Sequence, residues 1–395
     1  MTSMKKQVLI AYQSMNIGGS TTSLLGLLDV LDYSNLEIDL QLYDNVGPYL
    51  NIIPSKVRLL KEARTFSHNK MLAIVQRLRY PIYWKTLFKV FQFKRKFPNS
   101  KVGAQITAYS RAAASRKNRK EYEVAIGFME MWSDCYVYER IKAKKKIAWI
   151  HVDYEKAGLI ADADREMFKS YDKIVLVSPD CLNSFVKIFP ELADKAICIE
   201  NILSEDSVRQ RAGLTNALLK KECGLSFGTV CRINFQHKGL DRAVCAFSRL
   251  KRFGYDFTWH IIGDGEDFQH LLNLIRKEDL EDRVFLYGAK DNPLPYVKKF
   301  DVFLLPSRYE GKPMAVTEAQ MLGVPSVVTN YASALEQVRN GQDGLVVNNS
   351  EEGIFEGMHY VLTHIDDLQK WRSNLCMKNF RNDTAINLLH TIIGV

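Results

Sequence analysis

Short apolar runs separated by polar, glycine-containing segments recur along the chain and predict buried β-strands that alternate with helices. The first run is followed by a loop at 13–20 and by an apolar-periodic stretch at 21–31, the order that opens a doubly wound unit. Together the runs of the first half predict one parallel-sheet domain. Its predicted strands lie at 5–12, 38–43, 124–128, 146–150 and 173–178.

A polar stretch at 203–226 interrupts this alternation, after which the pattern begins again. We therefore expect an α/β protein with two doubly wound, Rossmann-like domains that face each other across a cleft between their carboxyl edges. The domains are expected at 1–202 and 203–379, and a C-terminal helix at about 380–395 can pack back onto the first domain. In the second half the predicted strands lie at 227–233, 258–262, 284–287, 302–305 and 326–328.

Length and composition fit this organisation. A chain of 395 residues is too long for one ordinary core, and its 47% hydrophobic and 25% charged content are those of a soluble globular protein. No apolar run approaches the roughly 18 residues of a membrane-spanning helix, and residues 1–9 lack the apolar core of a secretory signal, so we expect a cytoplasmic protein. Seven scattered cysteines, without a CxxC pair or a histidine at ligand spacing, predict structural thiols and no metal cluster.

The net charge of +9 is concentrated in one stretch. No acidic residue occurs between Glu62 and Glu121, where fifteen Lys and Arg lie; subtracting these fifteen from the +9 leaves −6 on the rest of the chain. Aromatic residues and cations alternate from Arg79 to Phe97, a composition that suits a helix lying in the interface of an anionic membrane. We expect the segment from Arg79 to Lys120 to bind the inner face of the cell membrane peripherally.

Two other interpretations of this segment remain open. The segment can form an amphipathic helix whose rings pack into the core of the N-terminal domain while its cations are merely solvated. Basic patches with aromatic residues also suit single-stranded nucleic acid, the interpretation that we favour least, and we expect no nucleic-acid partner.

One predicted strand–turn–helix carries two glutamates. The strand at 302–305 is followed by a turn at 307–313 and by a helix at 314–322 that begins just after a proline. A helix that starts at the carboxyl end of a parallel strand offers unpaired N–H groups and about half a positive charge to an anion. We expect a phosphate to meet these amides and sugar hydroxyls to meet the carboxylates of Glu310 and Glu318. Glutamates at this spacing also occur by chance on solvated faces, so the spacing alone does not decide.

Further motifs occur in a fixed order between residues 228 and 347. In this order they resemble the retaining glycosyltransferases with two facing Rossmann-like domains, the GT-B fold, and in particular glycosyltransferase family 4. The first half of the chain resembles that family only through Gly18-Gly19 and through Trp149-Ile150-His151 after a strand. The motifs of the second half are Arg232 with Lys238-Gly239, Gly263-Asp264-Gly265, Gly288, Pro306-Ser307, Glu310-Gly311, Glu318-Ala319, Gly323-Val324-Pro325 and Asp343-Gly344-Leu345.

The resemblance implies a role for each matching residue. Arg232 and Lys238 would bind the diphosphate, whose negative charge grows as the bond to the sugar breaks. Glu310 would contact the hydroxyls of the donor sugar, Glu318 the ribose, and His151 the donor sugar from the N-terminal domain. Surface charge for the two cations and packing for His151 are the structural alternatives. The remaining positions implied to bind phosphate, sugar or acceptor are Gly18, Gly19, Gly311, Lys312, Pro313 and Met314.

The resemblance also implies the reaction. The family transfers a sugar from a nucleotide diphosphate sugar with retention of configuration, and the departing phosphate oxygen takes the proton of the acceptor. Members generally bind no catalytic metal, so we expect no cofactor. We expect a hexosyltransferase that uses a UDP-sugar and a polyprenyl-diphosphate-linked or other lipid-linked glycan, in the biosynthesis of capsule, exopolysaccharide or another cell-surface polysaccharide. The alternatives are a sugar-nucleotide epimerase of the same fold and a non-catalytic GT-B partner subunit.

Two positions depart from the family pattern. After the strand at 326–328 many relatives carry a glycine-rich loop, whereas this chain has Asn330-Tyr331-Ala332-Ser333. The residue after Glu310-Gly311 is often aromatic and is Lys312 here. These departures bear on the identity of the donor sugar and leave the reaction class unchanged.

Overall fold

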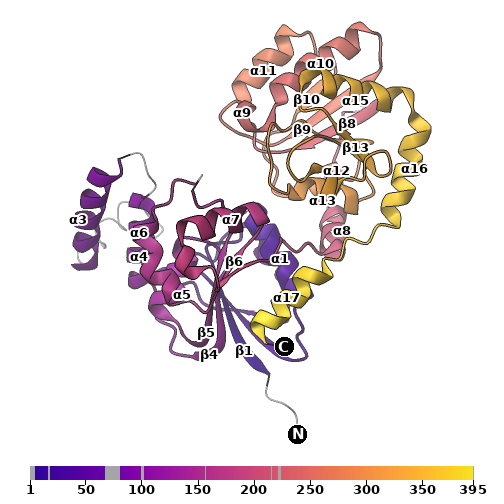
Figure 1. The fold of residues 1–395 in the computed structure, drawn as a ribbon. Helices are drawn as coiled ribbons and strands as arrows, with labels where there is room; N and C mark the ends of the chain where they lie inside the picture. The colour runs from indigo at the N-terminus through magenta and orange to yellow at the C-terminus, as the bar shows by residue number, and fades with distance from the viewer. Residues whose placement is uncertain are drawn as a thin grey trace. The chain divides into compact units, whose positions relative to one another are not determined.

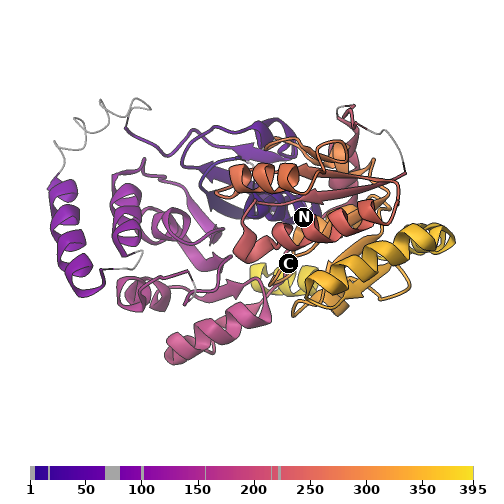
Figure 2. The same ribbon diagram turned by 90° about the horizontal axis from the view of Figure 1, so that it is seen from above.

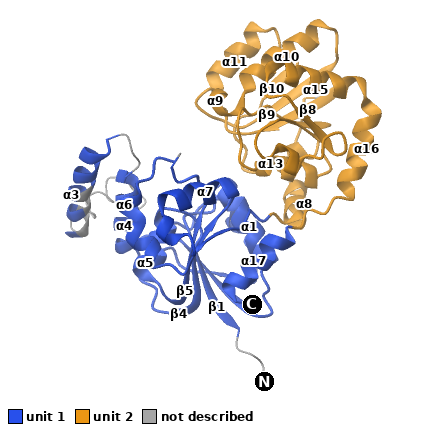
Figure 3. Ribbon diagram, viewed as in Figure 1, with its two compact units in different colours: residues 1–202, 382–395 blue, residues 203–381 orange. Residues whose placement is uncertain are grey.

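The computed structural model of the protein describes residues 5–16, 18–66, 81–98, 102–155, 157–214, 216–220 and 224–394. The chain forms two compact units (Figure 3). Unit 1 comprises residues 1–202 and 382–395, and unit 2 comprises residues 203–381. The chain therefore returns to unit 1 at its C-terminal end.

Unit 1 is built on a seven-stranded sheet with the strand order β3-β2-β1-β4-β5-β6-β7, in which every pair of neighbours is parallel (Figure 1). Its first strand is central, and Val8 pairs with Ile38 on one side and Val124 on the other. The strand order thus reverses at the boundary between β1 and β4. The strands are β1 (Lys6–Tyr12), β2 (Leu36–Leu42), β3 (Val57–Leu59), β4 (Glu121–Gly127), β5 (Lys142–Ile150), β6 (Lys173–Leu176) and β7 (Ala196–Cys198).

Helices cover both faces of this sheet, so its central strands are apolar on both sides. Val8 and Ile10 point to a core that α1 and α17 complete, whereas Leu9 and Ala11 point to a core that includes α4 and α5. The C-terminal α17 is therefore part of unit 1. The helices are α1 (Gly19–Val30), η1 (Pro48–Ile52), α3 (Pro81–Lys96), α4 (Val102–Ala114), α5 (Trp132–Arg140), α6 (Ala161–Lys169), α7 (Pro179–Ile188), η2 (Pro190–Leu192) and α17 (Asp383–Ile393).

Unit 2 repeats this design with a six-stranded parallel sheet in the order β10-β9-β8-β11-β12-β13. Its first strand, β8, lies between β9 and β11, so the strand order reverses at the β8–β11 boundary. Ligands of open α/β sheets bind at such a boundary, beyond the carboxyl ends of the strands. The strands are β8 (Leu225–Val230), β9 (Phe257–Ile262), β10 (Val284–Leu286), β11 (Val302–Leu305), β12 (Ser326–Thr329) and β13 (Gly344–Val347).

The helices of unit 2 also enclose its sheet from two sides. One core joins the sheet to α10, α11 and α15, and a second joins it to α13 and α14. The helices are α8 (Glu205–Gly213), α9 (Phe235–Lys238), α10 (Leu240–Arg252), α11 (Phe268–Lys277), α12 (Leu294–Val297), α13 (Met314–Met321), α14 (Ala334–Gln337), α15 (Glu351–Thr363) and α16 (Ile365–Cys376).

The predicted α/β class with two parallel sheets is confirmed, and most predicted strands agree with the structure within a few residues. The prediction at 227–233 is wrong at its end, because β8 stops at Val230 and the next N–H groups bond the carbonyls of Ile262 and Asp264. The polar stretch at 203–226 contains α8. None of the described helices is long and apolar enough to cross a membrane.

Candidate functional site in unit 2

The loops that follow β8 and β11 carry the residues predicted to bind the donor. Because these two strands are parallel neighbours, with Phe227 opposite Val302, their carboxyl ends lie at the same edge of the sheet. Lys238 comes after the first strand and Glu310 after the second. The switch point of the sheet therefore brings together residues that are 72 positions apart.

The Glu310 carboxylate is held by three side chains. Lys238 Nζ lies 2.5 Å from Oε1, and the Ser307 hydroxyl donates to the same oxygen over 2.6 Å. His237 Nε2 lies 3.6 Å from Oε2. The side chains of Glu310 and Lys238 are only 8% and 15% exposed, so the pair is largely shielded from water.

These contacts decide the charge of Glu310. Burial favours the neutral acid, but hydrogen bonding from His237 and the charge and hydrogen bond of Lys238 outweigh it, so the pKa of the carboxyl lies below its usual value. Glu310 is therefore an anion at neutral pH. It is suited to accept hydrogen bonds from hydroxyl groups rather than to donate a proton.

A short helix and a glycine bring Lys238 to this position. The Asn234 side chain caps α9 by accepting the His237 N–H over 2.8 Å, and α9 ends at Gly239, which has φ +63°. A Cβ at Gly239 would collide with the carbonyl oxygen of Pro306. Glycine is therefore needed both for the left-handed backbone and for the close approach of the two loops.

Arg308 fastens the two loops together. Its guanidinium donates to both oxygens of Asp241 over 2.8 and 2.7 Å, and the main-chain N–H of Arg308 donates to the His237 carbonyl over 2.8 Å. A bidentate arginine–carboxylate pair is directional as well as strong. The spacing between Lys238 and Glu310 is therefore fixed from outside the pair.

Arg232, the other predicted diphosphate ligand, is placed differently. Its side chain is 74% exposed and pairs with Glu266 over 3.3 Å. No contact between Arg232 and the Lys238–Glu310 pair is found among the described residues. Of the two predicted cations, only Lys238 is built into the cluster, and Arg232 lies on the surface beyond β8.

Glu318 faces a partner that the sequence did not indicate. It lies in α13, and its Oε1 is 3.3 Å from Nη2 of Arg211 in α8. Burial raises the pKa of Glu318 above its usual value, and Arg211 opposes this. Gly311 and Lys312 are exposed, Pro313 is the N-cap of α13, and the helix begins at Met314. The predicted contact of Glu318 with a ribose stays a prediction.

The other predicted site residues belong to unit 1. Gly18 is the N-cap of α1 and Gly19 its first residue. His151 follows β5, and its ring packs against Phe128 at 5.0 Å. Burial lowers the pKa of His151 to about 3, so its ring is neutral near pH 7.

Sequence reasoning missed several residues of these sites. In unit 2, the motif Pro306-Ser307 was recognised without a role for Ser307, and His237 carried only a weak signal, a histidine beside the predicted lysine. In unit 1, the Glu130 carboxylate accepts the main-chain N–H of His151 over 3.1 Å. Glu130 precedes Met131, whose φ of +73° is rare for a residue other than glycine. That backbone conformation has no sequence signal.

The described residues contain no group of three or more His, Cys, Asp or Glu side chains that could hold a metal ion.

The two parallel α/β units share the fold of GT-B glycosyltransferases, and an anchored carboxylate–lysine pair lies at the switch point of the second. Residues 219–375 match the model of the family "Glycosyl transferases group 1". The predicted resemblance is thereby confirmed at the level of GT-B glycosyltransferases, whereas membership of family 4 stays a prediction.

Known proteins resemble this chain as follows. An "O-antigen biosynthesis glycosyltransferase WclY" of Escherichia coli is 26% identical over 42% of this chain and 45% of its own length. A Campylobacter jejuni "N-acetylgalactosamine-N,N'-diacetylbacillosaminyl-diphospho-undecaprenol 4-alpha-N-acetylgalactosaminyltransferase" is 29% identical over 52% of this chain and 55% of its own. The chain spans about half the length of these relatives. A crystal structure of Anabaena HepE with UDP and glucose covers 98% of this chain and 99% of its own, with a TM-score of 0.65 and 14% identity, a likeness of fold.

Proposed function

We propose that this protein is a retaining glycosyltransferase of family 4 that moves a sugar from a UDP-sugar to a lipid-linked glycan in cell-surface polysaccharide biosynthesis. The anchored Glu310–Lys238 pair, inside the segment that matches the family, is the observation that carries the proposal. The names of the relatives support the substrate classes, because one is an O-antigen glycosyltransferase and another acts on a diphospho-undecaprenol glycan. HepE was crystallised with UDP and glucose, which supports the choice of nucleotide.

The chemistry follows from charge. As the sugar leaves, its diphosphate gains negative charge, and fixed positive groups stabilise the transition state more than the ground state. Lys238 supplies one such group and the N-terminal amides of α13 supply another. Arg232, exposed in the loop after β8, would rotate onto the diphosphate when it binds. The ionised Glu310 would accept hydrogen bonds from hydroxyls of the donor sugar.

The proton needs no dedicated base on this route. The departing phosphate oxygen takes the proton of the acceptor hydroxyl, the bond to the sugar breaks, and the new glycosidic bond forms on the same face. His151 is neutral because of its burial, so it would orient the sugar through a hydrogen bond rather than through charge. We propose no metal cofactor, since the cations and amides above provide the positive charge.

Release of UDP from a panel of UDP-sugars, with and without a polyprenyl-diphosphate glycan, tests this function. We expect release that depends on the acceptor, and a Glu310→Gln variant that is about 10- to 100-fold slower in kcat/KM because it loses charged hydrogen bonds to the sugar. Glu336→Gln, an exposed glutamate of α14, is the matched control and should be unchanged. Conversion of the sugar nucleotide without any acceptor would indicate an epimerase, and no turnover with any donor would contradict the proposal.

We further propose that α3 binds an anionic membrane. Trp84, Leu87, Phe88 and Phe91 are 56, 43, 64 and 68% exposed and follow an i, i+3, i+4, i+7 spacing, so they form one apolar stripe. These four side chains, the α3 stripe, do not pack into the N-terminal core. Basic residues occupy the last turn of α3, and the helix has no acidic residue. In Figures 1 and 2 the helix lies on the outer side of α4, which it contacts.

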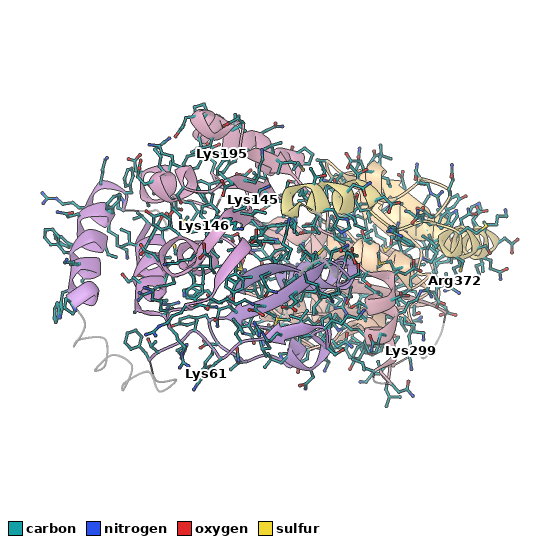
Figure 4. The ribbon with its side chains drawn as sticks, turned by 90° about the horizontal axis from the view of Figure 1, so that it is seen from below. Lys61, Lys145, Lys146, Lys195, Lys299 and Arg372 are labelled. Carbon is teal, nitrogen blue, oxygen red and sulfur yellow. The ribbon has the colours of Figure 1, made fainter. Side chains whose placement is uncertain are left out.

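Charge chemistry favours a lipid surface as the occupant of the α3 stripe. Two other cations of unit 1, Lys195 and Lys146, which Figure 4 labels, are tied to the main chain. Lys195 donates to the carbonyls of Lys169 and Tyr171, and Lys146 donates to that of Tyr138. Lys96, in the last turn of α3, is 69% exposed although its Nζ lies 3.8 Å from Asp162 Oδ2. A basic group contributes about 1 kcal/mol near an anionic surface. Arg79 and Tyr80, at the start of the predicted membrane segment, lie outside the described residues.

Cosedimentation with vesicles tests this contact. We expect binding to vesicles that contain phosphatidylglycerol, loss of binding in high salt, and little binding to pure phosphatidylcholine. The double variant Phe88→Ser/Phe91→Ser should bind more than about tenfold more weakly, because each buried ring contributes about 2 kcal/mol. Phe253→Ser, equally exposed but in unit 2, is the control. Equal binding of the wild type and the double variant would refute the assignment.

A further inference from the structure

The loop after β12 packs against the loop that carries Glu310. Residues 330–333 and the short helix α14 follow this strand and reach back toward the start of α13. The Ser333 hydroxyl donates to the carbonyl of Gly311. Gln337 Nε2 donates to the carbonyl of Pro313 over 3.0 Å and to Thr317 Oγ1 over 3.0 Å.

The Gln337 side chain is fixed on all sides. The residue is 4% exposed, and its Oε1 accepts the Tyr331 hydroxyl over 3.1 Å. Its main-chain carbonyl accepts Gln320 Nε2 over 3.1 Å and Lys378 Nζ over 2.8 Å. Because the carbonyl of Pro313 can only accept, the amide nitrogen of Gln337 must face it. The contact is therefore a built feature of the fold rather than a surface coincidence.

The two anchored carbonyls determine where the next amides point. A trans peptide unit is planar, and its C=O and N–H groups point in opposite directions. With the Gly311 carbonyl held toward Ser333, the N–H of Lys312 is directed away from α14. With the Pro313 carbonyl held toward Gln337, the N–H of Met314 is directed away as well. These are two of the amides expected to face the sugar and the diphosphate.

We propose that Ser333 and Gln337 are positioning residues of the donor site, which orient the amides of Lys312 and Met314 toward the diphosphate of the nucleotide sugar. The inference rests on the proposed function and adds a second layer of residues to it. Neither residue contacts the substrate in this account. They act by setting the two peptide planes at the start of α13.

This role also explains a departure from the family pattern. A glycine-rich loop has no side chains, so it could make neither the Ser333 bond to Gly311 nor the Tyr331 bond that holds Gln337. The ring of Tyr331 is buried, and its hydroxyl donates to Gln337 Oε1 over 3.1 Å. The loop after β12 and α14 thus contact the segment that leads into α13.

Equilibrium binding of UDP, measured by calorimetry, tests the proposal. Ser333→Ala should weaken binding about three- to tenfold, the effect of losing one neutral hydrogen bond. Ser333→Thr retains the hydroxyl and should bind nearly as the wild type does. Gln337→Met has a side chain of similar shape but no hydrogen-bond donor, and it should weaken the binding of UDP at least as much as Ser333→Ala does. Leu335→Ala, which removes a 64% exposed side chain of the same helix, is the control.

The outcomes separate this inference from the proposed function. If the wild type binds no nucleotide diphosphate, the proposed function itself fails. If the wild type binds UDP and both Ser333→Ala and Gln337→Met bind it equally well, the positioning role is wrong while the function stands. A lower melting temperature with an unchanged Kd would also overturn the inference, because that is the signature of a purely structural contact.

Discussion

Replacing Lys238 with methionine should reverse the pH dependence that Glu310 gives to the stability of unit 2. The change removes the cation that lies 2.5 Å from Oε1 and keeps an unbranched side chain of similar length. In the wild type the pKa of Glu310 lies below its ordinary value of 4.5, although burial alone would raise it. The ionised carboxylate therefore stabilises the fold above about pH 4.5, and this contribution is lost as the pH falls through the folded pKa. Without Lys238 burial should dominate, so the pKa of Glu310 should rise above 4.5. The variant should then lose stability as the pH rises.

The size of the effect follows from the burial of the pair. Removing one partner of a fully buried ion pair costs about 3–5 kcal/mol, and the 15% exposure of Lys238 places this case at the lower end, at about 3 kcal/mol at pH 7. For a unit of this size that corresponds to a melting temperature lower by about 6–12 °C.

Thermal and denaturant unfolding at pH 5 and pH 8 would measure both the loss and its slope. The double variant Lys238→Met/Glu310→Gln should recover part of the stability, with a coupling of about 1–3 kcal/mol, because it leaves no unpaired buried charge. Lys298→Met, at an exposed position, is the control and should change stability by less than about 0.5 kcal/mol. A Lys238→Met variant with wild-type stability, or with the pH slope of the wild type, would refute the reasoning.

Two further predictions concern stability. Arg211→Met should destabilise unit 2 by about 3 kcal/mol, because Glu318 keeps its burial and loses its cation. Burial already raises the pKa of Glu318, so the variant should lose more stability at pH 8 than at pH 5. Denaturant titrations at the two pH values would measure this difference. Ending the chain at Arg381 should unfold unit 1 and leave unit 2 folded, because α17 buries Leu389, Ile392 and Ile393, which contribute about 2 kcal/mol each. Hydrogen exchange of the truncated protein would show which unit loses protection, and full protection of unit 1 would contradict the prediction.

The strands that carry the site were predictable from sequence because parallel strands are buried on both faces and read as apolar runs. The run at 302–305 matches β11 (Val302–Leu305), and the helix predicted after the proline is α13. The strands β3, β7 and β13 were not predicted; each lies at an edge of its sheet and is only partly buried, so its apolar pattern is weak.

The partners of the site residues could not be predicted, because they come from distant parts of the chain. Arg211 lies 107 residues from Glu318, and no local pattern connects them. Arg232 and Lys238 look equivalent in sequence, but one is exposed and the other buried against Glu310. Likewise, the bond from Gln337 to the carbonyl of Pro313 depends on the packing of α14 and not on any motif.

The most direct test of the account is a crystal structure of the protein with UDP bound. We predict that the diphosphate lies at the carboxyl ends of β8 and β11, within hydrogen-bond distance of Lys238 Nζ and of the Met314 N–H. A diphosphate bound elsewhere on the protein, with the Lys238–Glu310 pair and the start of α13 untouched, would contradict the central claim.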